Sequence, residues 1–238
     1  MTDTCCFCGA PATSDEHVPP KGIFPQLKDS PDGRDYRVNL ITVRACDLHN
    51  RGKSSDDEYL LYVLAMSLPS NEIAKSQFLT KIRRAVHRTP KLLDALLLRQ
   101  QPVRVHDRAK DEWHDTIAIQ PDEARLAGIF AHIAKGVYFH ETQHVWGGDT
   151  TVLIEFMLSL TDVKWNQGQT ALEARLNVTF ANVPHQGQNP DVFSYQLLEE
   201  NGQPLVRLHF YGNARVTVGP SLQDGGEGTS GAGQVELL

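Results

Sequence analysis

Two short pairs of metal-ligating side chains lie near the start of the chain, a Cys-x-x-Cys pair and a Cys-x-x-His pair. Thiolate and imidazole are the usual ligands of tetrahedral structural zinc, and a two-residue gap lets both side chains of a pair reach one ion. Gly9 follows the first pair and lets the backbone turn away. The spacing predicts one structural zinc site, with Cys6 left open as an alternative thiol. The expected ligands are Cys5, Cys8, Cys46 and His49.

A second group of side chains offers oxygen and nitrogen atoms. Glu16 and His17 are adjacent, and Asn50 directly follows the second pair. Carboxylate and amide oxygens suit Mg²⁺ or Mn²⁺ better than zinc. A neutral imidazole with a pKa of about 6.5 can take a proton from water at neutral pH. These residue types therefore predict a cation beside a general base, which is what hydrolysis of a phosphodiester requires.

This arrangement resembles the HNH endonuclease family, in its zinc-containing ββα-metal branch. The family pattern appears here as Glu16-His17, Asn39-Leu40 and a second metal-binding pair followed at once by Asn50, over about residues 5–55. The chain departs from the commoner pattern at three positions. Glu16 replaces the commoner Asp, and the second metal-binding pair ends in His49 rather than Cys. The third residue of the family signature is Asn50 rather than His. Residues 133–140 resemble a segment of larger bacterial HNH-containing proteins.

The resemblance implies a role for each matching residue. His17 would be the general base and Asn39 would orient its ring, while Glu16 and Asn50 would hold the catalytic Mg²⁺ or Mn²⁺. The nearby cations Arg51 and Lys53 are expected either to bind phosphates that flank the cleaved bond or to lie on a solvated surface. The expected activity is cleavage of nucleic acid, DNA in the first place, leaving a 5′ phosphate. Such modules recur in bacterial restriction and phage defence.

Two other classes of function stay open. One is a non-catalytic, zinc-stabilised module that binds nucleic acid or a protein partner. The other is a regulated effector whose C-terminal sheet binds a partner or a small ligand. The basic residues of 75–88 suit either a solvated helix face or a nucleic-acid backbone. His140 and His144 have the spacing of a zinc protease motif, but the helix that carries His140 is expected to end near Tyr138, which argues against that site.

Composition sets the broad class. The chain has 238 residues, a net charge of −6 and 40% hydrophobic residues, which is typical of a globular protein and does not by itself indicate nucleic-acid binding. No apolar run is long enough for a transmembrane helix, and the N-terminus does not resemble a secretory signal. Three of the four cysteines crowd into positions 5–8, which indicates metal binding in a reducing compartment rather than disulfides. We therefore expect a cytoplasmic protein with no membrane partner.

The pattern along the chain predicts an α+β fold. We expect an HNH module at 1–66, an α+β domain of unknown role at 67–220 and a disordered Gly- and Ser-rich tail at 221–238. The first 54 residues look loop-rich. Predicted helices cover 55–66, 70–87, 91–98 and 122–138. Predicted strands cover 103–105, 116–119, 152–158, 176–180, 192–197 and 205–211, with a hairpin turn at 200–203 and an antiparallel C-terminal sheet.

Overall fold

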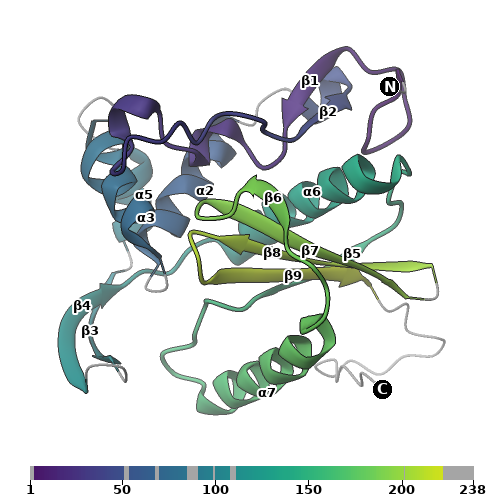
Figure 1. Ribbon diagram of the computed structural model, residues 1–238. Coiled ribbons are helices and arrows are strands. Elements are labelled where there is room, and N and C mark those ends of the chain that lie inside the picture. The colour runs from purple at the N-terminus through teal and green to yellow at the C-terminus, as the bar shows by residue number, and fades with distance from the viewer. Residues whose placement is uncertain are drawn as a thin grey trace.

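The computed structural model describes residues 3–50, 54–67, 70–84, 91–98, 100–107, 111–200 and 202–221. The fold is α+β, as predicted. A five-stranded sheet lies between two long helices, and the N-terminal segment lies beside one of these helices (Figure 1). Arg51, Lys53 and the predicted tail from residue 222 onward fall outside the described residues.

The C-terminal sheet is antiparallel throughout, with the strand order β5-β9-β8-β7-β6. The strands are β5 Thr150–Ile154, β6 Gln186–Asn189, β7 Phe193–Glu200, β8 Gln203–Phe210 and β9 Ala214–Pro220. Glu200 pairs with Gln203, which confirms the predicted hairpin turn. The predicted sheet is therefore confirmed, but the sequence pattern missed β6, which has no apolar residue, and β9.

The two faces of this sheet differ in polarity. On β8, Val206, Leu208 and Phe210 are fully buried in the apolar core, while Arg207 and His209 alternate with them and belong to the opposite face. Helix α6, Glu123–Thr142, lies on the apolar side, and helix α7, Val163–Phe180, covers the polar side (Figure 1). The apolar side thus holds the core to which the N-terminal segment is attached.

The predicted strand at 176–180 is wrong, because these residues form the last turns of α7. The side chain of Asp162 caps this helix by accepting a hydrogen bond from the Trp165 amide. Leu176 and Phe180 are buried four residues apart, as on one face of a helix, whereas Val178 between them is 78% exposed. The local alternation of apolar and polar residues resembled a strand only over this short window. The strand predicted at 152–158 is also shorter and ends at Ile154.

The middle of the chain is helical, and its helices lie where the sequence predicts them. It contains α2 Ser54–Met66, α3 Glu72–Gln77 continuing as the π-helical turn η3 Phe78–Ile82, and α5 Lys91–Leu97. The strands β3 Gln101–Asp107 and β4 Glu112–Ala118 pair with each other, which confirms the predicted strand pair and extends it. In the predicted basic stripe, Lys75 pairs with Glu72 and Arg84 with Asp29, while residues 85–90 lie outside the described residues.

The N-terminal segment contains a hairpin followed by a helical turn, elements that the ββα resemblance implied although the residue pattern looked loop-rich. Its elements are β1 Ser14–His17, β2 Thr42–Ala45 and α1 Asp47–Asn50, with the 3-10 turns η1 Lys21–Ile23 and η2 Leu27–Asp29 in the long connection. The two strands are antiparallel. The segment expected to be loop-rich therefore has an antiparallel strand pair followed by a helical turn.

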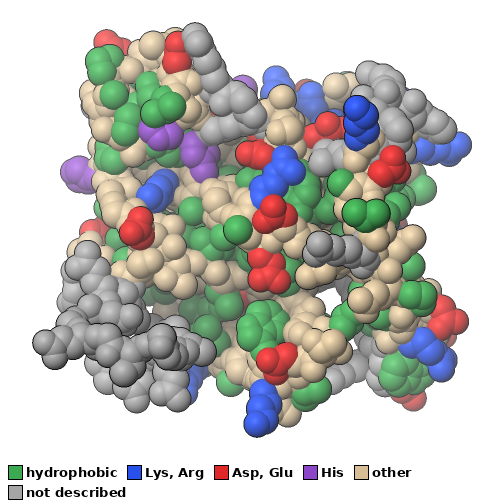
Figure 2. Space-filling view, turned by 180° about the vertical axis from the view of Figure 1, so that it is seen from behind, with side chains coloured by type: hydrophobic (Ala, Val, Ile, Leu, Met, Phe, Trp, Pro, Cys, Tyr) green, Lys and Arg blue, Asp and Glu red, His purple; other side chains and the backbone are tan. Residues whose placement is uncertain are grey.

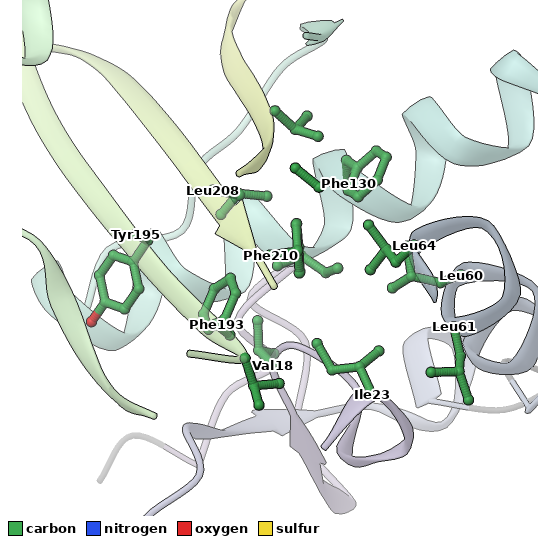
Figure 3. Packing of buried hydrophobic residues seen from close by; sticks show 14 of the residues in the cluster. Val18, Ile23, Leu60, Leu61, Leu64, Phe130, Phe193, Tyr195, Leu208 and Phe210 are labelled. Atoms are coloured by element: carbon green, nitrogen blue, oxygen red, sulfur yellow. The ribbon is translucent and has the colours of Figure 1, made fainter. Parts of the chain in front are cut away.

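One hydrophobic cluster of the described residues joins the N-terminal segment to the helices and the sheet. The second half of helix α2 is buried on all sides, with seven consecutive buried residues from Tyr59 to Ala65, as expected for a helix segment in the centre of a core. Figure 3 shows how side chains from distant parts of the sequence meet there; it labels Val18, Ile23, Leu60, Leu61, Leu64, Phe130, Phe193, Tyr195, Leu208 and Phe210. Among the described residues, no helix has both the length and the apolarity needed to cross a membrane.

Candidate metal centre and adjacent cleft

The four predicted zinc ligands form a cluster in which the ligand atoms all lie within 4.8 Å of one another. Cys46 Sγ is 3.2 Å from His49 Nδ1, Cys5 Sγ is 3.6 Å from the same nitrogen, and Cys8 Sγ is 3.9 Å from Cys46 Sγ. Two sulfurs bound tetrahedrally to zinc would be about 3.8 Å apart. The spacing and the ligand types show that this cluster could hold a metal ion such as zinc.

The backbone around the cluster explains its shape. The Gly9 amide donates to the Cys5 carbonyl over 2.8 Å, and Gly9 has a φ of +71°, so the chain turns back directly after the first pair. The His49 amide donates to the Cys46 carbonyl over 3.0 Å, which brings the second pair into one helical turn. Cys6, the alternative thiol, is fully buried in the hydrophobic core and is not part of the cluster. Its amide donates to the Arg44 carbonyl, which ties the first pair to β2.

The hairpin places Glu16 and His17 at the end of β1. Glu16 lies opposite Val43 and His17 lies opposite Thr42. Glu16 is almost fully buried, with 9% of its surface exposed, while His17 is half-buried. Adjacent residues of a strand point to opposite sides, yet Glu16 and His17 both border the same cleft.

His17 lies in surroundings that favour its neutral form. Burial lowers the pKa of its imidazole below the ordinary value of 6.5, and the Lys21 ammonium acts in the same direction, while Asp15 opposes it weakly. At neutral pH the ring therefore has a lone pair available to accept a proton. This is the protonation state that a general base needs.

Asn39 lies just before β2, in the left-handed region with a φ of 52°, which asparagine tolerates better than most residues. Within the part of the chain that the structure describes, no hydrogen bond joins the Asn39 side chain to the His17 ring. Its expected role in orienting that ring remains a prediction.

Asn50 is connected to the hairpin through a different residue. Its Nδ2 donates to Ser14 Oγ over 2.7 Å. Ser14 is two residues before Glu16 and therefore on the same side of β1. The Asn50 amide thus lies next to the strand face that carries the Glu16 carboxylate.

Glu16 has a partner that the sequence analysis did not identify. His132 Nε2 of helix α6 lies 2.8 Å from Glu16 Oε1. The His132 ring stacks on Phe7, which lies between the two cysteines of the first pair, with ring centroids 3.6 Å apart and planes tilted by 25°. Phe7 also contacts the ring of His49 at 5.3 Å. One aromatic side chain therefore bridges the zinc-type cluster and the Glu16 partner.

One face of α6 packs against the N-terminal segment. Gly136 lies so close to Val18 that a Cβ on this glycine would be 2.7 Å from Val18 Cγ2. Three turns towards the helix start, Arg125 forms an ion pair with Asp56 of α2 at 2.6 Å. His132 lies between these two contacts on the same stripe of the helix. The helix therefore holds the residue after His17 and the partner of Glu16 at fixed positions.

These contacts enclose a cleft of about 310 Å³ between the hairpin, the start of α2 and α6. Its ionisable lining residues are Glu16, His17, Asp56, Asp57, Arg125 and His132. Seen from behind in Figure 2, histidine side chains gather on the side of the molecule that carries the N-terminal hairpin, and acidic and basic side chains are intermingled over the centre. Carboxylates and imidazoles together are typical ligands of a divalent cation.

The protease-type motif does not form. Helix α6 runs one turn beyond the predicted end and includes His140, but Gln143 has a φ of 61° and ends it. His144 therefore lies outside the helix and does not continue the face that carries His140.

Comparisons with protein-family models, with curated proteins and with solved structures find no match to this chain. The HNH resemblance therefore rests on the residues of this sequence alone.

The sequence carried only a weak signal for His132. The helix of 122–138 was predicted, and the resemblance at 133–140 began one residue after it. Arg125, His132 and Gly136 are seven and four residues apart, which puts them on one helix face. That spacing could have indicated a common contact surface, but the contact with Glu16 spans 116 positions of the sequence.

Proposed function

We propose that the chain is a divalent-metal-dependent phosphodiesterase of the HNH type, which cleaves nucleic acid, DNA in the first place. The observation that carries this proposal is the cleft in which the half-buried His17 lies beside the paired side chains of Glu16 and His132. The strand pair, the helical turn and the four-ligand cluster that surround it support the same assignment.

His17 is the general base of the proposed reaction. Its neutral imidazole takes one proton from a water molecule, and the water oxygen forms a bond to phosphorus. The bond from phosphorus to the 3′ oxygen breaks, and that oxygen takes a proton from solvent. The products are a 5′ phosphate and a 3′ hydroxyl. The lowered pKa of His17 supports this role, because the base is neutral at the pH of a cell.

Glu16 and Asn50 supply oxygen atoms that suit Mg²⁺ or Mn²⁺. Ser14, which accepts a hydrogen bond from the Asn50 amide, lies two residues before Glu16 on the same face of β1, and Glu16 lines the cleft. A divalent ion in this position would offset the charge that develops on the phosphate and on the leaving oxygen. The four-ligand cluster has a different role, because thiolates suit zinc and all four of its ligand positions come from protein.

The substrate side of the proposal begins with a cation near His17. Lys21 lies close enough to lower the pKa of His17 and would also attract a phosphate. Arg51 and Lys53 belong to the same proposal as phosphate-binding residues. With a net charge of −6, the protein would bind nucleic acid through this local site rather than through its overall charge.

The test is cleavage of supercoiled plasmid and of single-stranded DNA and RNA by the full chain, with Mg²⁺ or Mn²⁺. Wild-type protein should cleave at least one substrate, and a chelator should stop it. His17→Ala should lower the rate by a factor on the order of 10²–10⁴ with little change in melting temperature. His114→Ala is the matched control, because this histidine is 54% exposed on the β3–β4 hairpin.

Equal rates for wild type and His17→Ala on every substrate would contradict the proposal. That result would favour the non-catalytic binding module.

A further inference from the structure

We propose that His132 of helix α6 is a ligand of the catalytic cation, so that the site is completed from outside the N-terminal hairpin. This inference rests on the proposed function and deepens it. The observation behind it is the approach of the His132 ring to the Glu16 carboxylate at the edge of the cleft.

The distance between the two side chains fits shared coordination. Neighbouring ligands of an octahedral ion, each about 2.1 Å from it, are separated by about 3.0 Å. Glu16 Oε1 and His132 Nε2 are 2.8 Å apart, so a small outward shift of either side chain would bring them to the separation of two neighbouring ligands of one ion. Both residues line the cleft, which provides the path by which an ion and a phosphate would enter.

The His132 ring is held in place on its flat side. Phe7 stacks on it at 3.6 Å, and only 22% of the His132 side chain is exposed. Phe7 is itself fixed, because it lies between Cys5 and Cys8, which both belong to the four-ligand cluster. A ring whose plane is fixed by packing, with Nε2 directed at a carboxylate, is preorganised for a ligand role.

A ligand role for His132 would also compensate for the weak oxygen ligand that Asn50 provides. An amide oxygen is a weaker ligand than an imidazole for transition metals, so a site of Glu16 and Asn50 alone would bind cations poorly. An imidazole from α6 restores a nitrogen ligand. The site should therefore prefer Mn²⁺, Co²⁺ or Ni²⁺ to Mg²⁺.

The experiment is pulsed EPR of Mn²⁺ bound to the zinc-loaded full chain, because a directly bound imidazole nitrogen modulates the Mn²⁺ spin echo. Wild type should show nitrogen modulation. His132→Ala should lose the modulation and bind Mn²⁺ more weakly by a factor of about 10–100. His132→Gln should also lose the modulation from a ring nitrogen, but its side-chain amide can still donate a hydrogen bond to Glu16. This second variant keeps the test valid if His132→Ala misfolds.

Two further variants act as controls. His140→Ala removes an exposed histidine two turns further along the same helix and should leave the modulation unchanged. His17→Ala should also keep the modulation, since His17 acts as a base in the proposed reaction.

The possible failures are distinguishable. If wild type cleaves nucleic acid and binds Mn²⁺ without nitrogen modulation, or if the modulation survives in both His132 variants, the ligand role is wrong while the proposed function stands. If wild type neither binds Mn²⁺ nor cleaves, both are wrong.

Discussion

Glu16 and His17 are neighbours in the chain, yet their surroundings suit them to different tasks. Glu16 is buried against His132, whereas His17 is half-buried with Lys21 nearby. A buried carboxylate needs a partner of opposite charge or a cation, because its desolvation is costly. A desolvated imidazole tends to lose its proton instead. In the proposed site, the adjacent pair would therefore provide a cation-binding group and a neutral base at the end of one strand.

The pKa shift of His17 predicts the pH dependence of cleavage. Burial lowers this pKa below 6.5, so the active neutral form is already dominant at neutral pH and is lost only as the pH falls through the lowered value. The rate at saturating Mn²⁺ should be flat near neutrality and should fall at acidic pH. The pH profile of kcat/KM measures this directly. Lys21→Ala removes a cation that favours the neutral ring, so it should move the acid limb to higher pH; an unmoved limb would contradict the assignment of that limb to His17.

Substitutions of the adjacent residues His49 and Asn50 should have different effects on the protein. His49→Ala removes a ligand of the four-residue cluster and should lose zinc and structure. Asn50→Ala should keep the zinc and most of the stability but lower cleavage, since it removes only the proposed oxygen ligand and one hydrogen bond to Ser14. Zinc content, melting temperature and cleavage rate together measure the difference. Identical behaviour of the two variants would contradict the separation into two metal sites.

Helix α6 is the element on which the cleft depends most. It provides His132 and Arg125, and its Gly136 accommodates Val18 in close contact. The strand pair β1–β2 is short and has no apolar core of its own, so it takes its position from α6 and from the four-ligand cluster.

Gly136→Ala tests this dependence. The new Cβ would lie 2.7 Å from Val18 Cγ2, and Val18 directly follows His17. We expect a loss of about 1–3 kcal/mol in the free energy of unfolding from overpacking, and a fall in cleavage rate because the His17 segment is displaced. Gly168→Ala is the control, because this glycine of α7 is exposed and its Cβ would meet open space. That variant should be as stable as wild type or up to about 1 kcal/mol more stable. Wild-type stability and activity in Gly136→Ala would show that α6 does not position the cleft.

The elements differ in how far the sequence could predict them. The long α6, the β7–β8 hairpin and the α2 helix were predictable, because each has a sustained periodic pattern or a clear turn signal. The β1 and β2 strands have four residues each, too few to show a period. The strand predicted at 176–180 was wrong because these five residues alternate between apolar and polar, as in a strand. The signal for a helix, the capping residue Asp162, lies fourteen residues earlier in the chain. The four-ligand cluster was predictable because its spacing is local, whereas His132 was not, since its contact with Glu16 is made only in the folded chain.

The molecule as a whole has a hydrophobic cluster that runs from the N-terminal segment to the sheet. Val18 and Ile23 belong to it together with Phe210 of β8 (Figure 3). The hairpin nevertheless contributes few buried side chains of its own, so a bound ion would supply much of its local stability. Loss of that ion should therefore affect the hairpin and the cleft first, and the sheet last.

The purified protein should carry about one zinc per chain, and Cys46→Ser should lose it. A site of three thiolates and one imidazole contributes on the order of 10 kcal/mol to folding, so the variant should be sensitive to proteolysis in the first fifty residues. Elemental analysis and limited proteolysis provide the measurements. Cys6→Ala is the control: it removes a buried thiol beside the cluster and should keep the zinc. A fully folded Cys46→Ser protein, from a wild type that contains no zinc, would contradict this prediction.

The most direct single measurement is the rescue of His17→Ala by added imidazole in the Mg²⁺- or Mn²⁺-dependent cleavage assay. The variant leaves a space in a cleft of about 310 Å³, where free imidazole can take the place of the missing ring. If His17 is the general base, cleavage by His17→Ala should rise with imidazole concentration, while wild type should not respond. A variant that cleaves as fast as wild type without imidazole, or that stays inactive at every imidazole concentration although it is folded and retains bound Mn²⁺, would contradict the assignment of His17 as the base.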